Sequence, residues 1–275
     1  MLPEMCPGMY EDGDAIGIFD SGVGGLTVAR RIAELLPEER LVYLGDTARV
    51  PYGTKSPATV TRYAVSCARL LMERGIKLLV VACNTASAHA LDPLRDLLDI
   101  PVVGVVEPGA RAAVSRSTRM KIGVIGTQGT IASGEYQSAI HALEPDAEVY
   151  AKACPLFVPL AEEGWTRGPI PEQIAQAYLS DLVQEEIDTL VLGCTHYPLL
   201  EDVIRKAVGD SIALVDSAEE TSKVVKETLY GMEPVASTGR VPAHQFLVSD
   251  LPDGFVRLAG TFFGQKIDSV EWVDF

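Results

Sequence analysis

The sequence lacks the features of a secreted, membrane-bound or nucleic-acid-binding protein. No apolar run approaches the roughly 18 residues that cross a bilayer. The segment 1–6 has neither a basic region nor a following apolar core, so it predicts no signal peptide. With 23 Lys and Arg against 38 Asp and Glu, the net charge of −15 disfavours binding to a phosphate backbone. We therefore expect a cytoplasmic protein with no membrane contact and no direct nucleic-acid binding.

Cysteine is scarce, and its spacing argues against two common uses. The five cysteines are an odd number and form no Cys-x-x-Cys pair, which disfavours a disulfide framework and a zinc ribbon. The composition is otherwise that of an ordinary globular protein, with 47% apolar and 22% charged residues. Its 275 residues suffice for one or two domains. We expect the thiols to be reduced and to serve either packing or chemistry.

Short apolar runs alternate with longer helical patterns along the chain. This alternation predicts parallel sheets joined by right-handed helical crossovers, which is an α/β fold. The expected strands are 16–20, 41–46, 78–82, 102–106, 122–126, 148–151, 189–193, 212–215 and 245–248. In the expected helix 59–74, a stripe of apolar residues at helical spacing includes Cys67 and places that thiol in the core. Cys154 is interpreted as a packing residue as well, and Cys6 as part of a disordered tail.

The two halves of the sequence resemble each other. Residues 16–21 match residues 122–127, and Cys83 matches Cys194, at a spacing that grows slowly from about 106 to about 111 residues. We interpret this as a duplicated unit that forms two pseudo-symmetric parallel-sheet α/β domains. The expected first domain is 1–106 plus 217–275, whose strand 245–248 would complete the first sheet, and the second is 107–216. The active site is then expected in the cleft between the domains.

Cys83 and Cys194 each close an apolar strand, and a threonine follows each of them within two residues. Ligands of parallel sheets bind beyond the carboxyl ends of the strands, where Asp20 and Thr127 are also expected. A helix that starts there would make both thiols easier to deprotonate. A single buried cysteine is usually a core residue, but the symmetric pair favours chemistry. His196 can relay protons for Cys194, and Asp20 can do the same for Cys83.

Other kinds of site fit the sequence less well. The Gly-rich turn in residues 20–27 fails the dinucleotide pattern at Thr27, so it is better suited to bringing backbone N–H groups close to a small anion. Asp20 can equally be a helix N-cap. A metal bound by Cys194 and His196 would lack two further ligands at metal spacing. Pyridoxal phosphate would need a lysine in the site, and the two lysines at strand starts, 77 and 121, lie at the wrong end of the sheet.

Several motifs together resemble one known family. They are the segment 20–27, Asp-Ser-Gly-Val-Gly-Gly-Leu-Thr, and the segments 82–88 and 193–199 around the two cysteines. Further similar segments are 43–46, 51–53, 126–130, 155–160, 162–164, 248–250 and 262–264. On these residues the chain resembles the cofactor-independent glutamate racemases of the aspartate/glutamate racemase family. The resemblance covers nearly the whole chain after residue 15.

This resemblance implies an isomerase that uses no cofactor, interconverts L- and D-glutamate and supplies D-glutamate for peptidoglycan synthesis. It implies that Cys83 and Cys194 are two bases, one removing the α-proton while the other delivers a proton to the opposite face. Asp20, Glu162 and His196 would assist these proton transfers. The implied substrate shell consists of Ser21, Pro51, Tyr52, Gly53, Asn84, Thr85, Thr127, Thr130 and Thr195. We also expect a homodimer whose ligand is this small-molecule substrate, with no metal.

Two alternatives remain open at the level of the sequence. The protein can be another two-cysteine racemase, for aspartate or a hydantoin, although the segment 193–198 favours glutamate. It can instead be a non-catalytic protein that binds an amino acid or regulates a partner through its acidic surface. The presence of both cysteines favours the enzyme.

Overall fold

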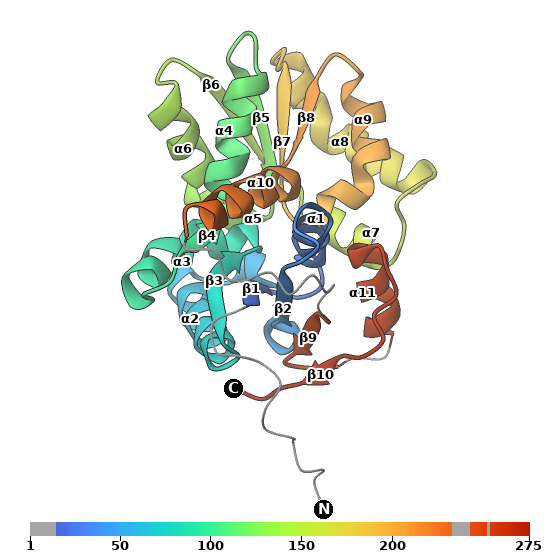
Figure 1. Ribbon diagram of the computed structural model, residues 1–275. Coiled ribbons are helices and arrows are strands. Elements are labelled where there is room, and N and C mark those ends of the chain that lie inside the picture. Colours follow the sequence, from blue (N-terminus) through green and yellow to red (C-terminus); the bar gives the residue numbers. More distant parts are fainter. Residues whose placement is uncertain (1–14, 233–242, 252–253) are drawn as a thin grey trace, which may run out of the picture.

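Two parallel sheets organise the chain in the computed structural model, which describes residues 15–232, 243–251 and 254–275. Sheet A has the strand order β10-β9-β2-β1-β3-β4, and sheet B has the order β6-β5-β7-β8. Figure 1 shows sheet B above sheet A, with helix α10 and the ends of the strands between them. Cys6 lies outside the described residues.

The strands of sheet A are β1 (Ala15–Asp20), β2 (Arg40–Gly45), β3 (Ile76–Val81), β4 (Val102–Gly104), β9 (Gln245–Val248) and β10 (Glu271–Trp272). Those of sheet B are β5 (Lys121–Gly126), β6 (Glu148–Ala153), β7 (Thr189–Gly193) and β8 (Ala213–Asp216). All neighbouring strands pair in parallel, as the alternation of strands and helices predicted.

The helices are α1 (Leu26–Leu35), α2 (Pro57–Glu73), α3 (Asn84–Leu97), α4 (Val106–Arg116), α5 (Gln128–Ser133), α6 (Glu135–Leu143), α7 (Phe157–Glu162), α8 (Pro169–Gln184), α9 (Glu201–Val208), α10 (Ser217–Tyr230) and α11 (Phe255–Phe263). Short 3-10 turns are η1 (Thr47–Arg49), η2 (Tyr52–Thr54) and η3 (Tyr197–Leu200). None of the helices within the described ranges combines the length and the apolar character needed to cross a membrane.

The two sheets repeat one topology. The order β2-β1-β3-β4 in sheet A recurs as β6-β5-β7-β8 in sheet B, so that four strands of sheet A have a counterpart, while β9 and β10 extend sheet A alone. The repeat extends to packing: a Cβ atom on Gly17 of β1 would come within 2.7 Å of Ile76, and one on Gly123 of β5 within 2.7 Å of Ile187. Each glycine thus leaves room for an isoleucine, which is the first residue of β3 in one domain and lies just before β7 in the other. The predicted pair of pseudo-symmetric α/β domains is confirmed.

All nine predicted strands are present, with ends shifted by at most two residues. The predicted strand 102–106 stops at Gly104 because the N–H of Val105 donates to Ser87 Oγ at 3.0 Å and α4 begins at Val106. Strand β10 was not predicted. It has only two residues, both exposed, and therefore no apolar run to reveal it.

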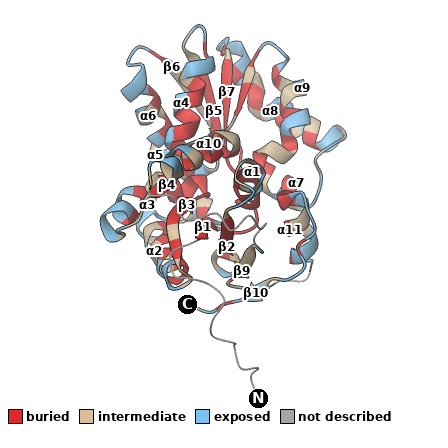
Figure 2. Ribbon diagram, in the orientation of Figure 1, coloured by how far each residue is buried: buried red, intermediate tan, exposed pale blue. Residues whose placement is uncertain are grey.

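The central strands are almost wholly buried, as Figure 2 shows in red, because helices cover both faces of each sheet. One apolar cluster joins the two domains, since it contains Ile18 and Leu26 near sheet A together with Leu192 of sheet B. Helix α10 packs against both α1 and α4. Cys67 and Cys154 are fully buried, which confirms both as packing residues.

Candidate active site

Cys83 lies where β3 ends, and it is the N-cap residue of α3. Its Sγ is 3.6 Å from Ser21 Oγ, at the end of the neighbouring strand β1. The start of the helix was expected to lower the pKa of this thiol. That expectation is wrong: burial, together with the nearby Asp20 carboxyl, raises the pKa of Cys83 to about 12. A hydrogen bond from the backbone of Ala86 opposes the rise without reversing it, because desolvation of a thiolate costs more than one N–H donor returns.

Cys194 occupies the equivalent position after β7, but no α-helix begins there. The chain passes through His196 into the short turn η3, so the expected helix start at this cysteine is also wrong. The imidazole of His196, rather than a helix N-terminus, lies beside this thiol. His196 Nδ1 lies 3.8 Å from Cys194 Sγ, and His196 Nε2 lies 3.0 Å from Glu162 Oε1. The three side chains therefore form a row from thiol to imidazole to carboxylate.

The surroundings of His196 favour its protonated form. Burial opposes the charge, but the hydrogen bonds with Cys194 and Glu162 outweigh it and raise the pKa of His196 to about 10. Glu162 sits at the end of α7, half-exposed, on the side of the imidazole away from the thiol. An imidazole held in this way can exchange a proton with the thiol while the carboxylate fixes the ring.

Asp20 is buried at the end of β1. Its Oδ2 accepts a hydrogen bond of 2.9 Å from the N–H of Gly22, and its Oδ1 has no partner among the described residues. Burial raises the pKa of the Asp20 carboxyl, although His196 nearby opposes that shift. A carboxyl with a raised pKa and one free oxygen can hold or accept a proton close to Cys83.

Both cysteines line one cavity of about 40 Å³. The cavity is lined by Ser21, Val50, Pro51, Tyr52, Gly53, Cys83, Asn84, Thr85, Thr127, Val158, Glu162, Cys194, Thr195 and His196. It thus brings together every predicted site residue except Asp20 and Thr130, which do not line it. Val50 and Val158 were not among the predicted site residues. The sequence signal for them was that each precedes a proline at matching points of the two similar halves, Val50-Pro51 and Val158-Pro159.

Threonine hydroxyls from both domains meet in the cavity wall. Thr85 Oγ1 of α3 lies 2.9 Å from Thr127 Oγ1 and 3.1 Å from Thr130 Oγ1. Thr127 is the N-cap of α5, and its Oγ1 accepts from the N–H of Thr130 at 3.3 Å. Thr130 therefore reaches the cavity through the two other hydroxyls rather than directly. Such hydroxyls can donate to a carboxylate on a ligand.

Asn84 offers a buried donor that is not used within the described part of the chain. Its Oδ1 accepts a hydrogen bond of 2.7 Å from Tyr136 OH, which sets the orientation of the amide. Its Nδ2 is left without a partner there, although it is buried. An unpaired buried donor is costly unless a ligand uses it, so this group is a candidate contact for an acceptor oxygen.

The two domains also contact each other beside Cys194. A Cβ atom on Gly24 would come within 2.5 Å of His196 Nδ1 and closer still to Thr195 Oγ1. Thr27 Oγ1 also donates to the carbonyl of Thr195 at 3.1 Å. The Gly-rich turn after β1 therefore packs against residues 194–196 of the other domain, called the Cys194 loop below. This is a more specific use of the glycines than the anion contact expected from the sequence.

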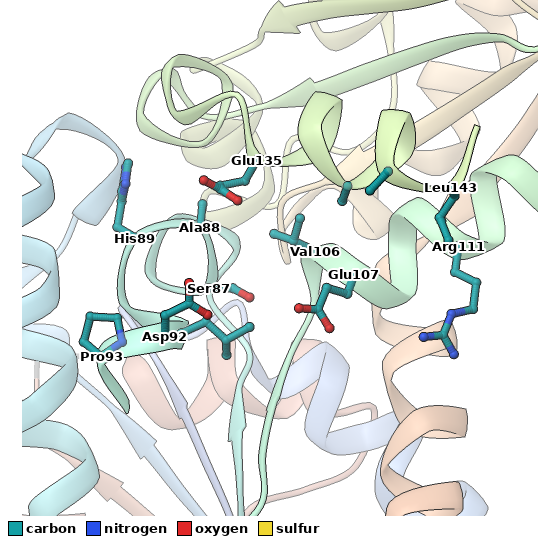
Figure 3. A pocket seen from close by; sticks show the side chains of 13 residues that line it. Ser87, Ala88, His89, Asp92, Pro93, Val106, Glu107, Arg111, Glu135 and Leu143 are labelled. Carbon is teal, nitrogen blue, oxygen red and sulfur yellow. The ribbon is translucent and has the colours of Figure 1, made fainter. Parts of the chain in front are cut away.

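A larger hollow of about 540 Å³ lies between α3, α4 and α6 (Figure 3). Its wall carries the carboxylates of Asp92, Glu107 and Glu135 together with Arg111, and neither cysteine belongs to it. Size alone therefore does not identify the reactive site. Among the described residues, no cluster of three His, Cys, Asp or Glu side chains is arranged to hold a metal ion.

Comparisons with known proteins agree with this geometry. The family model described as Asp/Glu/Hydantoin racemase matches residues 16–224. A glutamate racemase of Geobacter metallireducens is 58% identical over 258 residues, which cover 93% of this chain and 95% of that protein. The structure of glutamate racemase isoform RacE1 from Bacillus anthracis superposes with a TM-score of 0.89 at 40% identity, covering 96% of this chain and 98% of that one. Glutamate racemase from Francisella tularensis, solved in complex with D-glutamate, gives 0.90 at 37% identity over 96% and 98% of the two chains.

Proposed function

The chain belongs to the Asp/Glu/hydantoin racemase family, and from this premise we propose that it is a glutamate racemase, an isomerase that interconverts L- and D-glutamate. One observation carries the proposal: Cys83 and Cys194 follow equivalent strands of two repeated domains and line the same cavity. Glutamate is favoured over other amino acids because the similar full-length relatives bear that name.

The proposed chemistry needs two thiols in opposite protonation states. As a thiolate, one cysteine takes the α-proton, and the electron pair of the C–H bond is left on the α-carbon. The other cysteine then gives its S–H proton to the opposite face of that carbon, so the configuration inverts and the charge moves from one sulfur to the other. The α-proton is only weakly acidic, which means that the site must stabilise the carbanion-like state and exclude water. A small buried cavity with fixed donors supports both requirements.

Each thiol has its own proton partner in this proposal. His196, held by Glu162, lies within hydrogen-bond distance of Cys194 and can receive or return its proton. Asp20 lies in the electrostatic environment of Cys83 and carries one oxygen without a partner in the described chain. These groups act on the thiols, and the thiols act on the substrate. The steps use only side chains of this protein.

The substrate carboxylates are proposed to bind the donors of the cavity wall. The Asn84 amide and the hydroxyls of Thr85, Thr127 and Thr195 supply them, with Thr130 behind the wall supporting the threonine cluster. Ser21, Pro51, Tyr52 and Gly53 complete the wall around the substrate. The present cavity of about 40 Å³ has room for a few water molecules, which is less than a glutamate occupies. Binding therefore requires the wall to open and to close again.

The wider role follows from the same family membership. We propose that the product D-glutamate supplies peptidoglycan synthesis in the cytoplasm and that the protein acts as a homodimer. The domain boundaries are proposed at 106/107 and 216/217, where the chain crosses between the sheets.

A racemisation assay tests the proposal. Purified protein is incubated with L-glutamate, and in parallel with L-aspartate, while optical rotation is followed with and without added pyridoxal phosphate. We expect glutamate to lose its rotation at the same rate in both conditions. Racemisation of aspartate alone would identify a different member of the family. Binding of glutamate in a calorimeter without racemisation would support the non-catalytic alternative.

A further inference from the structure

The tail motif 248–250 has no part in the proton transfers, yet it contacts a wall of the active site. Residues 46–54, called the 46–54 loop below, run from the end of β2 and supply four consecutive residues to the cavity, 50 to 53. At Gly53 an added Cβ would lie 2.7 Å from Thr127 Cβ, so the loop packs directly on the opposite domain. Any shift of the loop therefore changes the substrate space.

One buried carboxylate holds the 46–54 loop in shape. Asp46 is fully buried, and its Oδ2 accepts a hydrogen bond from Tyr52 OH. Its Oδ1 accepts from Arg49 Nε at 2.9 Å and from Ser249 Oγ at 2.8 Å. Burial raises the pKa of Tyr52, which keeps the phenol protonated and therefore a donor. One oxygen of Asp46 thus faces the active-site wall, and the other faces the tail motif.

The tail motif also binds the backbone at the base of the 46–54 loop. Ser249 Oγ accepts from the N–H of Ala48 at 3.0 Å, and the N–H of Asp250 donates to Thr47 Oγ1 at 2.8 Å. Ser249 is itself fixed by β10, because Trp272 Nε1 donates to its carbonyl at 3.1 Å. Two parts of the sequence that are about 200 residues apart therefore form one hydrogen-bonded unit.

Two aromatic rings contact the guanidinium of Arg49. The guanidinium carbon lies 4.5 Å from the ring centre of Phe275 and 4.8 Å from that of Tyr63. The Tyr63 ring in turn lies 5.7 Å from the ring of Tyr52. A guanidinium that contacts two rings and donates to a buried carboxylate has little freedom to turn, so Arg49 presents its Nε to Asp46 in a fixed direction.

We propose that Ser249 and Phe275 are positioning residues for substrate binding, acting through Arg49 and Asp46 on the 46–54 loop. This inference rests on the proposed racemase function. Neither residue lines the cavity. Their effect is on the place of Tyr52 and Gly53, which contact the substrate before and during the reaction. Loss of either residue therefore weakens binding of substrate and transition state alike, which raises KM and leaves kcat nearly unchanged.

Four substitutions and one control test the inference. In Ser249→Ala and Phe275→Ala, we expect KM for L- and D-glutamate to rise about three- to tenfold, with kcat within about twofold of wild type. Ser249→Thr and Phe275→Tyr keep the hydroxyl and the ring and should retain the wild-type KM. Val273→Ala is the matched control, because Val273 is buried in the same core cluster against which Phe275 packs. It should lower Tm without changing KM.

The outcomes separate this inference from the proposed function. Wild-type KM in folded Ser249→Ala and Phe275→Ala would overturn the inference, as would an equal rise in KM in Val273→Ala. If the wild-type protein fails to racemise glutamate, the proposed function fails. The dissociation constant of D-glutamate, measured by calorimetry on the same variants, then decides the inference by the same comparison.

Discussion

At the scale of single residues, the two cysteines are equivalent in position and unlike in surroundings. Cys83 is buried next to the Asp20 carboxyl, and burial raises the pKa of the Cys83 thiol, which favours its protonated form. Cys194 adjoins an imidazole whose pKa lies near 10. A reaction that moves one proton between two faces needs one thiol and one thiolate at the start of each turnover. The unlike partners give each cysteine its own route for losing and regaining a proton.

Single cysteine variants should separate proton removal from proton delivery. Cys83→Ala and Cys194→Ala each remove one of the two bases, so racemisation should fall by about a thousandfold or more. The base that stays can still exchange the α-proton of the enantiomer facing it. Proton NMR in heavy water should therefore show slow exchange without inversion, for opposite enantiomers in the two variants. Cys154→Ala, which removes a buried packing thiol, should racemise like the wild type. Normal racemisation by either active-site variant would contradict the two-base mechanism.

The row from Glu162 to Cys194 predicts a pH effect with a definite sign. A raised pKa means that His196 is protonated below about pH 10 and loses its proton as the pH rises through that value. Glu162→Gln removes one of the groups that raise this pKa, so the alkaline fall of kcat/KM should begin at lower pH. The pH profile of kcat/KM measures this shift. Glu163→Gln changes the exposed neighbouring carboxyl and should leave the profile in place. An unmoved alkaline limb in Glu162→Gln would show that His196 does not control it.

At the scale of structural elements, the ends of strands and the loops that follow them build the site. The carboxyl ends of β1 and β3 present Asp20 and Cys83, and the end of β7 presents Cys194. Cys83 has the N-terminus of α3 and the Asp20 carboxyl beside it, and burial still raises the pKa of its thiol. No α-helix begins at Cys194, and His196 lies beside that thiol instead. The turn after β1 then locks the Cys194 loop in place across the domain boundary.

A methyl group on Gly24 should disable the site while leaving the fold intact. The added Cβ would overlap the His196 ring and Thr195 Oγ1, and either the turn or the Cys194 loop must move. Because a shift of this size misplaces a catalytic group, kcat should fall by about a hundredfold. Gly22→Ala is the control, since its Cβ would meet only a Val50 methyl at 3.4 Å. Steady-state kinetics and Tm of both variants provide the comparison. Equal kcat values for the two variants would contradict the inference that the Gly-rich turn holds the Cys194 loop in its active position.

The strands and the paired cysteines could be predicted from the sequence because buried strands appear in it as apolar runs, and both cysteines directly follow such runs. A strand covered on both faces must be an apolar run, and parallel strands present their ends at one edge. Strand β10 has only two residues, both exposed, and so has no apolar run. Glu162 came from the family resemblance alone, because its place beside His196 is set by the path of α7, which no local pattern encodes. The raised pKa of Cys83 depends on how deeply the thiol is buried, and that too is a property of the assembled domains.

At the scale of the whole molecule, catalysis and access make opposite demands on the two domains. Residues of both domains line the cavity of about 40 Å³, so the proposed chemistry takes place with the domains together. The apolar cluster that contains Ile18 and Leu192 favours this closed arrangement. In the proposed mechanism, substrate enters when contacts such as the one between Gly53 and Thr127 separate. A glutamate bound by donors of both domains would then stabilise the closed state.

Hydrogen exchange should show this joining of the domains directly. With saturating DL-glutamate, amide exchange should slow in the 46–54 loop and in α5 (Gln128–Ser133) together, because one ligand contacts both. Exchange in α9 (Glu201–Val208), which supplies no residue to the cavity, should change little. L-Lysine at the same concentration carries only one carboxylate and should protect neither segment. Mass spectrometry of peptic fragments measures all three regions in one experiment. Protection confined to the 46–54 loop or to α5 would mean that the substrate contacts only one domain. It would contradict the proposal that bound glutamate holds the two domains closed.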